Sequence, residues 1–299
     1  MPLYSSMPFL ADRLLSRESP PGRCPNALIM PRFTIFMDVA GRVSKETKGY
    51  ESISVSAVAL HTSQLPILRN ELALLNLPKW KDCSPIHLNR IYSFLDTHHL
   101  FCAAICINKL TSAWSNFWDR ANQWHDHVAS VHRMKTGYLK AANIIKYWVF
   151  GQCSSLLIAN LIQKFPPILL DSRGLGVVDI FPVCDSDIQG QENIDVFKDC
   201  WDKFNQHQHK VNKLGINVFI RGLDIKTEQD EPLLLLPDYL CGMVHVIYGV
   251  GSPAIPSSVS HTHIQKYIST LSSNQTLSIR EIDFNLSYAD IIPDSISLP

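Results

Sequence analysis

The stretch FTIFMD at residues 33–38 decides the fold of this 299-residue chain. It is a short apolar run of strand-forming residues that ends on Asp38 and leads into a polar loop at residues 42–50. The next segment, residues 51–60, alternates apolar residues with serines, which predicts a second strand with two different faces. The chain from residue 33 to residue 60 is therefore predicted to form a strand, a loop and a strand.

The rest of the chain alternates strand-like and helix-like segments. Apolar runs predict further strands at residues 99–107, 167–171 and 216–220. Apolar residues at helical spacing predict helices over residues 63–76, over the long tract 111–164 and from Pro237 onward, whereas residues 172–210 read as mixed loop and helix. This order of elements indicates a mixed α/β sheet with helices packed on it.

Composition excludes several classes of protein. Hydrophobic residues make up 46% and charged residues 18%, which is typical of a globular protein. The 27 basic and 27 acidic residues cancel, so the chain does not coat nucleic acid through bulk charge, although a local basic groove remains compatible with the sequence. The longest apolar tract, residues 144–162, is interrupted by Lys146, Gly151 and several polar residues, so no membrane span is predicted.

Cysteine usage and the first residues predict a cytoplasmic protein. The eight cysteines are scattered and form no CxxC pair, which favours buried thiols in a reducing compartment over a zinc site. Residues 1–29 contain charged residues and prolines and lack the apolar centre of a signal peptide, so we expect a loosely packed arm.

Three aspartates stand at positions where α/β sheets hold their sites. Asp38 and Asp171 each follow an apolar strand, and Asp238 lies in the first turn of the last predicted helix. Carboxylates gathered there repel one another unless a hard cation such as Mg²⁺ bridges them. Two such ions, about 3.5–4 Å apart, can clamp the attacking and leaving oxygens of a phosphodiester. Aspartate is also a common turn and cap residue, so a structural role stays open for each.

Two motifs resemble a mostly bacterial family of uncharacterised proteins with a ribonuclease-H-like fold. That family opens with a strand ending in Asp-Glu-Ser-Gly, and residues 36–41 of this chain read FMDVAG. Its closing helix begins roughly Leu-Gln-Leu-Ala-Asp-Leu-Ile-Ala-Gly, and residues 234–242 read LLLPDYLCG. An inner strand that ends in Asp-Arg is matched by PILLDSR at residues 167–173. The resemblance spans about residues 30–250, and the closing motif is the more specific.

The resemblance implies a ribonuclease-H-like mixed sheet with flanking helices and a metal-dependent nuclease site. Asp38, Asp171 and Asp238 would hold Mg²⁺ or Mn²⁺, and Glu71 is a candidate for a fourth catalytic carboxylate. Asp185 and Asp187 are further possible ligands or ordinary loop residues. Val39 stands where the family has glutamate, and valine cannot ligate a cation.

Local charge and aromatic residues point to possible partners. Residues 161–200 carry three basic and seven acidic residues, whereas residues 111–150 carry five basic and two acidic ones. The basic helical tract can contact phosphates of RNA or DNA, and its tryptophans can stack on bases or on a protein partner. The same tryptophans, Trp114, Trp118 and Trp148, have the spacing of core residues, which is the favoured interpretation.

Other motifs give little support to other chemistries. The close histidine pairs at residues 125–127, 207–209 and 261–263 include one in helical sequence, where such spacing does not form one face. No dinucleotide, P-loop or serine-hydrolase signature is present in the sequence.

Two functions therefore remain as hypotheses for a three-part chain. The parts are an arm at 1–29, a ribonuclease-H-like domain at 30–250 with a helical insertion at about 111–165, and an extension at 251–299. The first hypothesis is a metal-dependent nuclease. The second is a catalytically silent module that binds nucleic acid, or a protein through the helical insertion.

Overall fold

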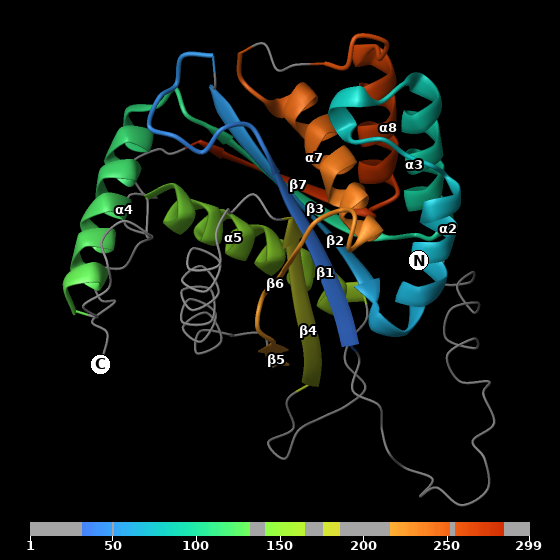
Figure 1. Ribbon diagram of the computed structural model, residues 1–299, viewed down its shortest axis with the longest axis horizontal. Helices are drawn as coiled ribbons and strands as arrows, with labels where there is room; N and C mark the ends of the chain where they lie inside the picture. The colour runs from blue at the N-terminus through green and yellow to red at the C-terminus, as the bar shows by residue number, and fades with distance from the viewer. Residues whose placement is uncertain are drawn as a thin grey trace, which may run out of the picture.

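A computed structural model describes residues 32–49, 51–131, 141–164, 176–185, 216–251 and 255–283. Within these ranges seven strands form one sheet in the order β5-β4-β1-β2-β3-β7, with β6 paired to β4 (Figure 1). The strands are β1 (Arg32–Ala40), β2 (Ser52–His61), β3 (Phe101–Asn108), β4 (Gly176–Asp185), β5 (Ile216–Ile220), β6 (Asp224–Lys226) and β7 (Leu277–Asp283). The α-helices are α2 (Leu65–Leu74), α3 (Pro85–Thr97), α4 (Ser112–Val131), α5 (Ala141–Lys164), α7 (Leu235–Tyr248) and α8 (His261–Ser273). Three short 3₁₀ helices are η1 (Thr62–Gln64), η2 (Trp80–Asp82) and η3 (Pro232–Leu234).

The sheet is mixed in direction. Strands β1, β2 and β3 form an antiparallel meander, and β1 also pairs in parallel with β4, which pairs in parallel with β5. The predicted hairpin is therefore present, with Asp38 opposite Ser56. This arrangement confirms the predicted architecture, a mixed α/β sheet flanked by helices.

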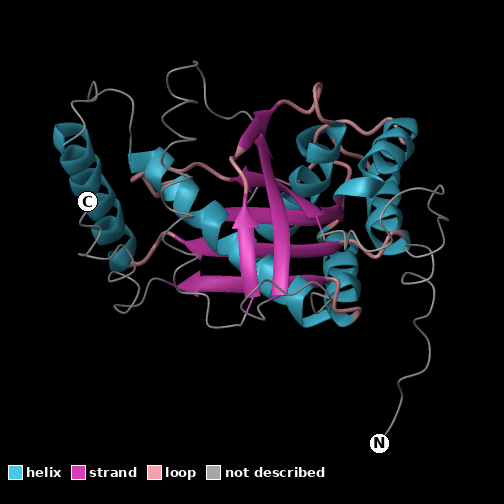
Figure 2. Ribbon diagram, turned by 90° about the horizontal axis from the view of Figure 1, so that it is seen from below, coloured by secondary structure: helices cyan, strands magenta, loops and turns pink. Residues whose placement is uncertain are grey.

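Helices cover both faces of the sheet. Helices α4 and α5 pack on one face, and α2, α3, α7 and α8 pack on the other (Figures 1 and 2). Alternate residues of β1 point to opposite faces, so Met37 packs with the α5 side and Phe36 with the α7 side. Burial on both faces explains why β1 reads as a nearly continuous apolar run in the sequence.

The long helical tract predicted from the sequence is confirmed as α4 and α5, with residues 132–140 outside the described part of the chain. The three tryptophans singled out in the sequence pack in the core, as the favoured interpretation predicted. Trp114 and Trp148 are buried, Trp118 packs partly buried beside them, and the Phe117 and Trp148 rings lie 5.0 Å apart between centroids. Buried rings cannot stack on bases, so Trp114 and Trp148 contribute to the sheet core rather than to an exposed aromatic surface.

Strand β4 corrects the sequence-based prediction for residues 172–210, where we expected loop and helix. Pro182 lies inside this strand, and a proline inside an apolar run argues against a central strand. The buried Asp179 also interrupts the apolar pattern of this strand. Its carboxylate forms ion pairs with Arg221 at 2.5 Å and with Arg32 at 3.7 Å. The strand predicted at 167–171 lies outside the described residues.

The chain beyond Gly251 contributes to the same core. Helix α8 packs against α7, and β7 pairs in parallel with β3 at the edge of the sheet. The boundary between a domain and an extension near residue 250 stays a prediction, but residues 261–283 are part of the packed sheet and its covering helices. Among the described residues, no helix combines the length and the apolar character needed to cross a membrane.

Candidate active site

Asp38 lies near the end of β1, on the face covered by α7. Its neighbour Met37 packs into the α5 side, and alternation along the strand turns Asp38 the opposite way. The side chain is only 8% exposed, and one oxygen, Oδ1, accepts a hydrogen bond from the Val39 amide at 2.7 Å. Asp38 is thus a buried carboxylate at the end of a central strand.

Helix α7 brings Asp238 to the same region. The hydroxyl of Ser56, which lies opposite Asp38, donates to the carbonyl oxygen of Pro237 at 2.7 Å. One turn further along, the Cys241 thiol accepts from the Ala40 amide at 3.1 Å and donates to the Ser54 carbonyl at 3.0 Å. These contacts fix the first turn of α7 across β1 and β2, so the structure places two of the three predicted aspartates in the same region of the sheet.

Asp238 is held in an environment that disfavours its charge. Burial is the largest cause and raises the pKa of its carboxyl from 3.8 to about 6, and the acidic neighbours Glu228 and Asp185 raise it further. The Trp80 amide donates to Oδ2 at 2.8 Å and opposes this rise, as does Lys79. Such a carboxylate takes up a proton near neutral pH unless a cation compensates its charge.

Asp185 is the last residue of β4, a strand that the sequence analysis did not predict. The parallel pairing of β1 with β4 puts Met37 beside Cys184, and Asp38 and Asp185 are the residues that follow this last pair of the register. Asp185 also contributes to the raised pKa of Asp238. Its sequence signal was the acidic end of an apolar run, VCD at residues 183–185, which Pro182 obscured.

The other predicted site residues lie elsewhere or outside the described chain. Asp171 and Asp187 fall outside the described residues. Glu71 lies on α2, where its carboxylate pairs with His98 at 2.9 Å between Oε2 and Nε2. Its role as a fourth carboxylate stays a prediction, because its printed contact joins α2 to the end of α3 rather than to Asp38 or Asp238.

Val39 packs on the other side of the sheet from Asp38. Its side chain contacts the apolar cluster beneath α5. A glutamate at this position would follow the same strand alternation and point away from Asp238. In this fold, the valine therefore does not remove a ligand from the side of the sheet where the aspartates gather.

The oxygen atoms of these aspartates can be compared with the ligands that a divalent cation needs. Among the described residues, no group of three or more His, Cys, Asp and Glu side chains lies close enough to hold an ion by itself. Mg²⁺ often takes only one or two carboxylates and completes its shell with water and phosphate oxygens. Asp38, Asp185 and Asp238 supply oxygen donors of this kind without forming a closed cage.

A buried lysine anchors the loop that follows Asp38. The Lys109 ammonium, 1% exposed, donates to the carbonyl oxygens of Arg42 at 3.1 Å and Glu46 at 2.7 Å. Burial lowers the pKa of this lysine to about 8, although nearby Glu51 opposes the shift. The β1–β2 loop is therefore held by the end of β3, close to the end of the strand that carries Asp38.

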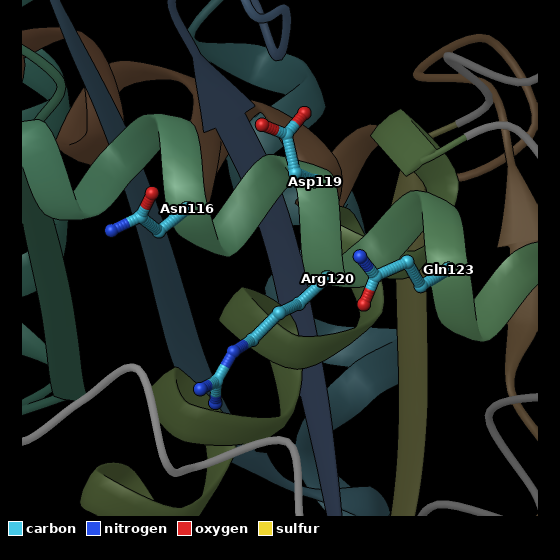
Figure 3. Close-up of a pocket in the computed structure, with 4 residues that line it drawn as sticks. All are labelled: Asn116, Asp119, Arg120 and Gln123. Atoms are coloured by element: carbon cyan, nitrogen blue, oxygen red, sulfur yellow. The ribbon is translucent and has the colours of Figure 1, made fainter.

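A shallow depression of about 260 Å³ lies on α4, away from the aspartates. Its lining residues are Asn116, Asp119, Arg120 and Gln123, all from one helix (Figure 3). Asp119 is paired with Lys45 at 2.7 Å. Binding sites usually combine polar groups from several elements in a concave, largely apolar pocket, so this depression is a surface feature of α4.

The described cysteines match the prediction of buried thiols, and one of the close histidine pairs lies at the surface. Cys83, Cys102, Cys106, Cys153, Cys184 and Cys241 are buried and unpaired as disulfides, and burial raises the pKa of the Cys102 thiol to about 12. His261 and His263 are exposed at the start of α8. The side chains of the other close histidine pairs lie outside the described residues.

Comparison with known proteins gives only distant similarities. No family model and no curated protein matches the chain. Among solved structures, the chain is similar to Bst-RNase HIII in complex with Mn²⁺, at 11% identity and a TM-score of 0.37, over 83% of this chain and 65% of that one. It is also similar to a mutant form of Bst-RNase HIII, at 12% identity and a TM-score of 0.37, over 81% and 63%. The chain thus spans slightly less than two thirds of each of these structures, and at this level the likeness carries no argument about function.

Proposed function

We propose that this protein is a metal-dependent nuclease that hydrolyses phosphodiester bonds of RNA or DNA. The observation that carries the proposal is that three carboxylates from separate elements, Asp38 of β1, Asp185 of β4 and Asp238 of α7, lie in one region of the sheet. Asp171, which lies outside the described residues, and Glu71 remain candidate contributors.

One or two of these aspartates would hold Mg²⁺ or Mn²⁺, with water and the phosphate oxygens of the substrate completing its coordination. When bound, such an ion stabilises the charge that develops on the phosphate and favours deprotonation of the attacking water. The chain itself supplies the preorganised negative charge, because Asp38 is buried in the sheet and Asp238 is fixed by the Trp80 amide. Partial exclusion of water strengthens the attraction between these carboxylates and a cation.

The test uses the purified full-length protein with end-labelled RNA and DNA, single-stranded and double-stranded. Cleavage that requires Mn²⁺ or Mg²⁺, stops with a chelator and disappears in both Asp38→Asn and Asp238→Asn supports the proposal. Asp119→Asn is the matched control, because this carboxylate sits in a surface ion pair on α4. Unchanged cleavage by the Asp38→Asn/Asp238→Asn double variant would overturn the assignment.

A catalytically silent module that binds a nucleic acid or a protein is the second candidate. It is favoured by the lack of any three-ligand group among the described His, Cys, Asp and Glu residues. Nucleic-acid binding with the same Kd in the presence of Mn²⁺ and of chelator, together with no cleavage, would support the module. A cytoplasmic location is proposed for either function, and the six buried thiols agree with a reducing compartment.

A further inference from the structure

A short segment, residues 78–83, crosses the start of α7 and contacts it at several points. We call this segment the strap. The Trp80 amide donates to Asp238, and the Trp80 ring meets the Tyr239 ring edge-on, with 5.9 Å between centroids. The Lys79 ammonium pairs with Glu228 at 2.6 Å. At its far end, the Cys83 carbonyl accepts a hydrogen bond from the Ser258 hydroxyl at 3.3 Å.

Gly242 explains how the strap comes so close to α7. It lies one helical turn after Asp238, and a Cβ atom placed on it would lie 2.4 Å from atoms of the Trp80 ring. The indole is therefore seated directly on the helix backbone. Glycine inside a helix costs about 1 kcal/mol relative to alanine, so a packing reason of this kind accounts for its presence. Gly242 is also the last residue of the closing motif, and the proposed function does not otherwise use it.

The hydrogen bond from the strap fixes the orientation of the Asp238 carboxylate. Among the described residues, the Trp80 amide is the one hydrogen-bond donor to this side chain. A carboxylate in the first turn of a helix is otherwise able to rotate, and binding sites work best when supporting contacts fix their ligands. With Oδ2 held by the amide, rotation of the carboxylate is limited and Oδ1 is kept in one position.

We propose that Trp80 and Gly242 are positioning residues for Asp238. The contact between the indole and the glycine sets the distance of the strap from α7, and this distance places the Trp80 amide against the carboxylate. The inference rests on the proposed function for its catalytic consequence, but its structural part stands on the strap alone. Trp80 acts through Asp238 and has no role in contacting the substrate.

The first experiment needs no catalytic activity. In protein labelled with ¹⁵N-tryptophan, the backbone amide of Trp80 is identified as the signal that disappears in Trp80→Phe. We expect Asp238→Asn to shift this amide signal, because the acceptor loses its charge, and Gly242→Ala to shift it as well, because the added Cβ pushes the ring off the helix. Leu74→Ala, at an 84% exposed position just before the strap, is the control and should leave it in place. A Trp80 amide that is unmoved in Gly242→Ala overturns the proposal.

The second experiment separates positioning from folding by rescue. Gly242→Ala should lower kcat with Mn²⁺ by about tenfold or more and leave KM nearly unchanged, because a displaced ligand affects the chemical step. Trp80→Ala keeps the backbone amide and removes the ring that clashes, so the Trp80→Ala/Gly242→Ala double variant should be more active than Gly242→Ala. A double variant that shows the product of the two single losses overturns the proposal. If Gly242→Ala does not fold, a folded double variant still supports the ring–glycine contact, and a double variant that is equally unfolded overturns it.

The two proposals fail in different ways. If the wild-type protein shows no metal-dependent cleavage, the proposed function falls, and the Trp80 amide signal still decides whether the strap holds Asp238. If the wild type cleaves and Gly242→Ala cleaves equally well, the nuclease stands and the positioning role falls.

Discussion

The two faces of the sheet are equally buried and chemically different. On the α5 side, β1 and β2 present Ile35, Met37, Ile53 and Val55 to the aromatic rings of α4 and α5. On the α7 side, the same strands present Asp38 and the serines of β2. The hydroxyls of these serines form hydrogen bonds with Pro237 and His245 of α7 and with Val250, which follows the helix. One pair of strands thus separates a largely apolar core from a more polar layer that holds the candidate site. The contrast indicates that changes on the first face should act on stability and changes on the second on activity.

The largest expected effect is on the polar face. Asp38→Asn and Asp185→Asn should each lower kcat by about a thousandfold or more, which corresponds to about 4 kcal/mol of activation free energy. Their unfolding midpoints in urea should stay close to that of the wild type. Asp171→Asn measured in parallel decides which aspartate completes the site, and full activity of Asp185→Asn would remove β4 from it.

The apolar face should respond in the opposite way. Trp148→Ala removes a buried ring that packs against Phe117, and large-to-small changes of this kind cost about 3–5 kcal/mol of unfolding free energy. Urea denaturation followed by circular dichroism measures the loss. At urea concentrations below its unfolding transition, Trp148→Ala should show the same metal dependence of cleavage as the wild type. A Trp148→Ala protein as stable as the wild type would show that this face is not the apolar core described above.

The charged carboxylate of Asp238 should lower the unfolding free energy of the protein. A pKa raised from 3.8 to about 6 means that the charged carboxylate costs the folded state about 3 kcal/mol at pH 7 and above. Asp238→Asn removes that cost and keeps an acceptor for the Trp80 amide, so it should stabilise the protein by about 2 kcal/mol at pH 7.5 in the absence of metal. Asp238 takes up its proton at a higher pH in the folded protein than in the unfolded chain. The difference in unfolding free energy between the wild type and Asp238→Asn should therefore shrink as the pH falls from about 7 to about 4. Thermal unfolding across this pH range provides the measurement, and a gap that does not change with pH would contradict the assigned burial.

The smallest expected effect concerns a single hydrogen bond between β2 and α7. Ser56→Ala deletes the donor to the Pro237 carbonyl and should cost about 1 kcal/mol of unfolding free energy. Ser44→Ala, in the exposed β1–β2 loop, is the control. A Ser56→Ala variant with unchanged stability and unchanged cleavage would show that this hydrogen bond does not hold α7 on the sheet.

Local patterns in the sequence predicted the elements that depend on local signals. The β1–β2 hairpin, β3, β5, the two long helices and α7 all lie where apolar spacing indicated them. Helix α3 was not predicted, although Ser84 caps its start and Pro85 occupies its first position. Helix α8 and β7 lie in a stretch rich in Ser and Thr, where no period stands out.

The candidate site was predictable only in part, because it depends on a pairing between distant strands. Asp38 and Asp238 each carry a local signal, an apolar run that ends in aspartate and a motif at a helix start. The neighbour of Asp38 is set by the parallel register of β1 with β4, about 150 residues away along the chain, and no local pattern specifies that register. Asp171 looked equally suitable because it also follows an apolar run. The strap is harder still to predict, since the contact of Trp80 with Gly242 joins residues about 160 positions apart.

The parallel pairing of β3 with β7 has a consequence for synthesis on the ribosome. Strand β3 is made about 170 residues before its outer partner. At roughly 5–20 residues per second, this edge of the nascent sheet waits about 10–30 s for β7. During that interval an apolar strand, FCAAICIN, has an unpaired edge that can join with other chains. Chaperone dependence during expression should therefore be greater for chains truncated before residue 277 than for the full-length protein.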